Sequence, residues 1–99
     1  MRIVAVSSRA GSEITEAALW YGPQHAGWGG EFLIKLDQAL ARLAANPRLF
    51  PVVRRAPDVR RVRLDRFPWQ RWFYLEGDPI RVFAVLHARR DPREWTERI

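Results

Sequence analysis

Apolar residues recur at helical spacing in the first half of the chain. Four of them fall at i, i+3, i+4 and i+7, which is the stripe of an amphipathic helix: Ile14, Ala17, Ala18 and Tyr21. Ser7, Ser8 or Ser12 can cap the start of this helix, and Gly22-Pro23 predicts its end.

The same period predicts a second helix over 31–45. Its inward positions are Phe32, Leu33, Leu36, Ala39, Leu40 and Leu43. Gly27-Trp28-Gly29-Gly30 precedes it as a tight corner, where glycine tolerates unusual backbone angles, and Asn46-Pro47 ends it. Two helices joined by so short a corner form an antiparallel hairpin.

Strand patterns occupy the N-terminus and the second half. Met1–Val6 is rich in β-branched residues, and 59–64 alternates apolar with charged positions. Trp69–Leu75 and Ile80–Leu86 are two apolar runs joined by the turn Glu76-Gly77-Asp78-Pro79. Trp69 and Trp72 should lie on opposite faces of their strand. We expect a loop over 49–58 and a charged tail over 88–99, with one helical turn around Arg93–Glu97.

The predicted order is therefore β-α-α-β-β-β in a single domain, 1–99. This order indicates an α+β fold, in which a helical hairpin packs on one face of a small, mainly antiparallel sheet.

Composition narrows the class of protein. Ninety-nine residues, 47% of them hydrophobic, suffice for one core. The absence of cysteine excludes disulfides and thiolate metal sites. No apolar run approaches the roughly 20 residues that cross a bilayer, and the N-terminal run is too short for a signal peptide. We expect a cytoplasmic protein without membrane contact.

The charge is basic and unevenly distributed. The net charge is +6, the isoelectric point is about 11.2, and Lys35 is the single lysine among seventeen basic residues. Most of the excess arginines follow residue 50, so one side of the fold should be positive. Because guanidinium groups match carboxylates and phosphates, an anionic or carboxylate-rich partner is expected.

The final hairpin places candidate chemistry at one end of the sheet. His87 is a possible acid or base near neutral pH, Tyr74 is a second possible proton donor, and cations to stabilise phosphorane charge are Arg61, Arg63, Arg89 and Arg90. These are the groups that RNA cleavage requires. However, nothing that titrates near pH 7 follows His87, which could equally cap the sheet edge through a backbone hydrogen bond. His25 and His87 lie too far apart in sequence to suggest a metal site, and no cofactor is expected.

Six short segments, in this order, resemble those of the RelE/ParE superfamily of toxins from type II toxin–antitoxin systems. They are Glu16–Leu19 with Trp20-Tyr21, Gly27–Leu33, Asn46–Pro51, Arg66-Phe67-Pro68-Trp69, Phe73-Tyr74 and Val85–Pro92. The resemblance covers nearly the whole chain and is closer to ParE than to RelE.

The resemblance implies a toxin that binds and poisons DNA gyrase without chemistry of its own. The residues that would bind the target are Arg61, Arg63, His87, Arg89, Arg90 and Arg93. A cognate acidic, partly disordered antitoxin would form a hetero-oligomer with the toxin, and it would contact Trp20, Tyr21, Trp28, Arg60 and Trp72. The alternative is a RelE-like ribosome-dependent mRNA endoribonuclease that uses His87, Arg61, Arg63 and Tyr74. A third possibility is a degenerate member that keeps only antitoxin binding.

Overall fold

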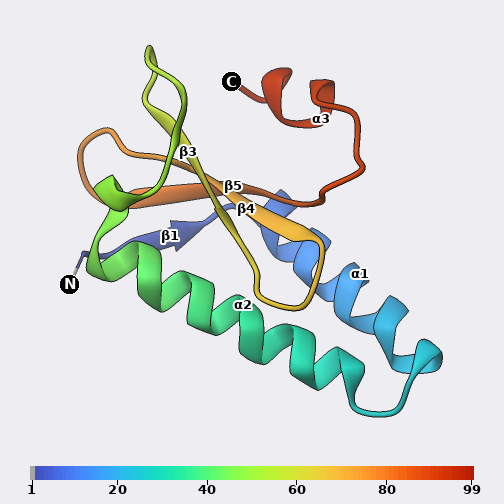
Figure 1. Cartoon of the computed structure of the whole chain (residues 1–99). Helices are drawn as coiled ribbons and strands as arrows, with labels where there is room; N and C mark the ends of the chain where they lie inside the picture. Colours follow the sequence, from blue (N-terminus) through green and yellow to red (C-terminus); the bar gives the residue numbers. More distant parts are fainter. Residues whose placement is uncertain (1) are drawn as a thin grey trace.

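Two long helices lie against one face of a five-stranded sheet in the computed structural model, which describes residues 2–99 (Figure 1). The strand order is β1-β5-β4-β3-β2, with β1 parallel to β5 and every other pair antiparallel. The elements are β1 (Val4–Val6), α1 (Ser8–Gln24), α2 (Trp28–Ala45), a 3₁₀ turn (Pro47–Leu49), β2 (Val52–Arg54), β3 (Val59–Arg63), β4 (Trp69–Tyr74), β5 (Ile80–His87) and α3 (Arg93–Thr96). The predicted start of the first strand at Met1 lies outside the described residues.

The helical hairpin forms where the apolar period predicts it, with different ends. Ser7 caps α1, since its Oγ accepts a hydrogen bond from Ala10 N at 3.1 Å. The predicted stop at Gly22-Pro23 is wrong: the helix continues through Pro23 to Gln24, because an exposed proline in the last turn removes only one helical hydrogen bond.

The corner between the helices is shorter than predicted. Only Gly27 adopts a left-handed conformation, with φ of 85°, and Trp28, Gly29 and Gly30 already form the first turn of α2. Leu33, predicted to face inward, is 42% exposed. It follows the buried Phe32, and one residue turns the side chain by about 100° around a helix.

The sheet contains one strand that the sequence pattern does not reveal. Val52–Arg54, expected in a loop, pairs with β3 as the edge strand β2. A three-residue strand next to Pro51 has too few positions to establish an alternating pattern, so only its pairing with β3 identifies it.

Each face of the sheet buries its own apolar cluster. The larger cluster lies between the helices and the sheet and includes Phe32, Leu36, Leu43, Val62, Phe73 and Val82. The second lies on the face away from the helices and includes Val59, Trp72, Phe83, Ala84 and Leu86. The C-terminal tail covers this outer face, where Figure 1 shows α3 on the side of the sheet opposite α2.

The two helices lie close together at Gly29. A Cβ atom added there would lie 2.8 Å from the carbonyl oxygen of Ala18, whereas one added at Gly30 would meet no atom of residues 2–99 within 4 Å apart from its own stretch of helix. We expect Gly29→Ala to lower the free energy of unfolding by about 1–3 kcal/mol, because backbone cannot yield locally. Gly30→Ala should instead raise it by up to about 1 kcal/mol through helix propensity. Urea denaturation of both variants checks this, and equal stabilisation by the two would contradict the close approach.

Candidate functional site

The register of the central strands places two arginines on the outer face of the sheet. Arg61 pairs with Trp72 and Arg63 pairs with Gln70 across β3 and β4. Because directly paired residues point to the same face, all four side chains lie away from the helices. Trp69 and Trp72 occupy opposite faces as predicted, with Trp72 only 5% exposed and Trp69 half-buried.

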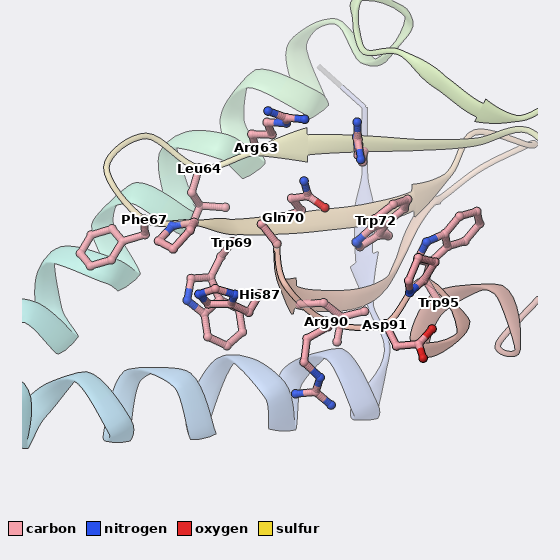
Figure 2. A pocket seen from close by; sticks show the side chains of 15 residues that line it. Arg63, Leu64, Phe67, Trp69, Gln70, Trp72, His87, Arg90, Asp91 and Trp95 are labelled. Atoms are coloured by element: carbon pink, nitrogen blue, oxygen red, sulfur yellow. The ribbon is translucent and has the colours of Figure 1, made fainter.

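These side chains border an open cavity of about 490 Å³, which we call the arginine groove (Figure 2). Trp72 lines it beside Trp95 from the tail, and the two rings stack at a centroid distance of 4.6 Å. The guanidinium carbon of Arg61 lies 5.6 Å from the centroid of the Trp72 ring, in cation–π geometry. The groove thus combines aromatic surface with fixed positive charge.

Ion pairs divide the predicted cationic set into two groups. Arg90 bonds to Glu94 at 2.9 Å and Arg93 bonds to Asp91 at 2.8 Å. The hydrogen bond from Arg93 lowers the pKa of Asp91, and the hydrogen bond from Arg90 lowers the pKa of Glu94. Within residues 2–99, Arg61, Arg63 and Arg89 have no acidic partner within 4 Å. Of these three, Arg61 and Arg63 line the groove.

His87 lies at the rim of the sheet on the helix-facing side. It pairs with Trp69, and the two rings meet edge to face at 5.5 Å. Its Nδ1 accepts a hydrogen bond from the backbone N of Arg89 at 3.0 Å, so the neutral ring carries its proton on Nε2. The sequence allows two interpretations of His87, a catalytic residue or a cap of the sheet edge that bonds to the backbone. The observed hydrogen bond is of the second kind.

Tyr74 does not join the other candidate catalytic residues. It lies at the far end of β4, outside the arginine groove, and its hydroxyl donates to the carbonyl oxygen of Arg98 at 3.5 Å. Burial raises its pKa. The structure therefore brings Arg61, Arg63 and His87 to the same cavity and leaves Tyr74 apart.

A second cavity, of about 620 Å³, lies between α1 and the ends of β4 and β5. We call it the aromatic groove, and its lining includes Trp20, Tyr21, Trp28, Trp69, Glu16 and His87. Tyr21 is buried, and its hydroxyl accepts a hydrogen bond from Trp69 Nε1 at 2.8 Å. Three of the five predicted antitoxin contacts, Trp20, Tyr21 and Trp28, are thus brought together.

The other two predicted antitoxin contacts lie elsewhere. Trp72 belongs to the arginine groove. Arg60 is 9% exposed and binds Asp58 through two hydrogen bonds of 2.9 and 3.2 Å. It also donates to the carbonyl oxygens of Arg48 and Phe50. Arg60 therefore holds the segment before β3 in place and does not present its charge to a partner.

The tail is fastened by a buried ion pair that the sequence pattern does not predict. The guanidinium of Arg98 binds the carboxylate of Glu13 through two bonds of 2.7 and 3.0 Å and also donates to the carbonyl oxygen of Phe83. Glu13 in turn accepts from Val85 N at 3.0 Å. Because β1 pairs with β5 only as far as Val82, this ion pair takes hydrogen-bonding positions on the β5 edge that β1 does not reach.

One arginine is buried on the helix-facing side, and its Nε and Nη1 atoms donate no hydrogen bond within residues 2–99. Arg71 is 3% exposed. Burial lowers its pKa to about 10, and the charge of Asp37 opposes this shift. The guanidinium therefore remains charged at neutral pH and forms no part of either groove.

Residues 2–99 contain no group of three or more histidine, cysteine, aspartate or glutamate side chains arranged to hold a metal ion. In the same range, no helix is both long and apolar enough to span a bilayer.

Comparisons of the sequence with protein-family models and with curated proteins give no match. The structure, however, is similar to a chain of the chromosomal ParDE toxin–antitoxin (TA) system from P. aeruginosa. The TM-score is 0.76 at 15% sequence identity, and the match covers 88% of this chain and 96% of that chain. The fold expected from the six sequence segments is confirmed: the chain has a RelE/ParE-like fold.

Proposed function

We propose that this protein is the toxin of a type II toxin–antitoxin system, that it acts in the cytoplasm, and that it poisons DNA gyrase by binding through the arginine groove. The fold shared with a ParDE component supports the toxin class. The choice of a binding mechanism over a catalytic one depends on the site itself, since one fold supports many functions.

The observation that carries the proposal is the pair Arg61 and Arg63. Their guanidinium groups border an open groove, lack acidic partners within residues 2–99, and lie beside the aromatic surface of Trp72 and Trp95. Tryptophan and arginine concentrate at the energetic centres of protein interfaces. A carboxylate-bearing surface of the target would supply the missing counter-charges.

The same geometry disfavours the nuclease alternative. Cleavage of RNA requires an acid and a base on opposite sides of the scissile phosphate. Of the two candidate proton carriers, Tyr74 lies outside the groove. His87 reaches the groove from the opposite face of the sheet, with Nδ1 already occupied by Arg89 N. Of these candidates, only Nε2 of His87 is left to serve as both the acid and the base.

A cognate antitoxin would neutralise the toxin at the helical hairpin. Leu19 and Trp20 of α1 are 70% and 59% exposed, and Ile34 of α2 is 53% exposed. These apolar side chains suit an amphipathic segment. An acidic partner would also pair with the unneutralised arginines, and the edge strands β1 and β2 could each accept an added strand.

Purified protein is expected to block the supercoiling activity of gyrase and to leave ribosome-bound mRNA uncut. The measurements are a plasmid supercoiling assay and mapping of transcript 5′ ends after expression. Codon-specific cleavage that disappears in His87→Ala would support the endoribonuclease instead. Normal growth during expression without an antitoxin would support a degenerate member that keeps only antitoxin binding.

A further inference from the structure

The aromatic groove contains a charged group that an apolar contact with an antitoxin would not require. Three indole side chains, Trp20, Trp28 and Trp69, share its lining with the carboxylate of Glu16. Trp20 is 59% exposed, and Trp28 is 39% exposed although His25 stacks on one face of its ring at a centroid distance of 4.9 Å, so both rings are partly accessible from solvent. Aromatic faces beside a carboxylate are the surroundings that stabilise an organic cation.

The other charges that line this groove are already neutralised. The carboxylate of Glu13 binds Arg98 at 2.7 Å, and the guanidinium of Arg90 binds Glu94 at 2.9 Å. His87 Nδ1 accepts from Arg89 N. Over residues 2–99, Glu16 has no basic group within 4 Å, which leaves one unneutralised acidic charge at the edge of an aromatic cavity.

We propose that the aromatic groove binds a basic side chain, arginine or lysine, of a partner segment. The apolar stem of that side chain lies along the indoles, and its charge pairs with Glu16. The antitoxin is the source of this residue, a point that depends on the proposed toxin function. An antitoxin that is acidic overall would therefore place a basic residue opposite α1, while its acidic residues face Arg61 and Arg63.

Two neutral-capped amino acids test the groove without any partner protein. N-acetyl-arginine methylamide carries the cation, and N-acetyl-citrulline methylamide has nearly the same shape without the charge. Titration of the intact protein, followed through the indole N–H resonances by NMR, should show about fivefold tighter binding of the arginine compound. The shifts should occur at Trp20 and Trp28.

Variants identify the groups responsible. Glu16→Gln should reduce the preference for arginine over citrulline to less than about twofold, since it removes the charge and keeps the shape. Trp20→Ala should weaken arginine binding about threefold. Thr15→Ala, which shortens the exposed side chain next to Glu16 on α1 but outside the groove, should leave both affinities unchanged.

Equal binding of the two compounds, or shifts confined to Trp72 and Trp95, would overturn the proposal. Because the titration contains neither gyrase nor antitoxin, its failure leaves the toxin function standing. Conversely, if the protein binds the arginine compound but does not inhibit gyrase, the basic-residue site is supported and gyrase is ruled out as the target.

Discussion

Glu13→Ala is expected to lower the free energy of unfolding by about 3–5 kcal/mol, the usual cost of breaking a buried ion pair by removing one partner. The change leaves the guanidinium of Arg98, whose side chain is 8% exposed, without its carboxylate. It also removes the acceptor for Val85 N on the β5 edge. Thermal denaturation should show Tm lower by more than about 10 °C, since one kcal/mol shifts Tm by roughly 4–8 °C in a domain of this size.

Glu16→Ala is the matched control, because Glu16 lies on the same helix, is exposed and has no ion-pair partner among residues 2–99. Its stability should stay within about 0.5 kcal/mol of the parent. If the two variants lose equal stability, the loss comes from the helix and not from the ion pair. A Glu13→Ala protein as stable as the parent would mean that the tail is not held through Arg98.

The double variant Arg61→Ala, Arg63→Ala is expected to raise the toxin concentration for half-inhibition of gyrase by roughly 100-fold. Two interface side chains that contribute somewhat over 1 kcal/mol each account for this factor. Inhibition by the parent protein should also weaken as salt increases, because the contact is electrostatic. The measurement is the supercoiling assay at two salt concentrations.

Arg54→Ala, Arg55→Ala is the control for net charge. Both residues are exposed near β2, away from the arginine groove, so the double variant loses the same charge and should retain inhibition within about threefold. Circular dichroism and Tm should show that both double variants are folded. An equal loss in the two would indicate attraction by net charge alone, without a defined arginine site.

Much of the architecture follows from local pattern. The period of Ile14, Ala17 and Tyr21 predicts α1, and the two apolar runs on either side of the final turn predict β4 and β5. Both signals come from residues that are close in sequence. β2 gives no such signal, since it forms a strand only through its pairing with β3.

The candidate site was only partly predictable. The arginine-rich second half predicts a positive side of the fold, and the structure places Arg61 and Arg63 of β3 at one groove. Trp20, Tyr21 and Trp28 share the aromatic groove, and their contact with an antitoxin stays a prediction. Glu13 and Arg98 give no motif, because their contact joins the two ends of the chain. The contribution of Trp95 to the arginine groove likewise depends on how the tail folds back.

The sequence by itself determined the two long helices and their hairpin, the strands other than β2 and the sign of the charge, because these depend on residue type and short-range spacing. Only the tertiary structure decided which arginines keep their charge available. Arg60, Arg90 and Arg93 meet carboxylates, whereas Arg61 and Arg63 meet none in residues 2–99. Whether a guanidinium is neutralised depends on distances of a few ångströms, and those distances follow from strand register and from the path of the tail.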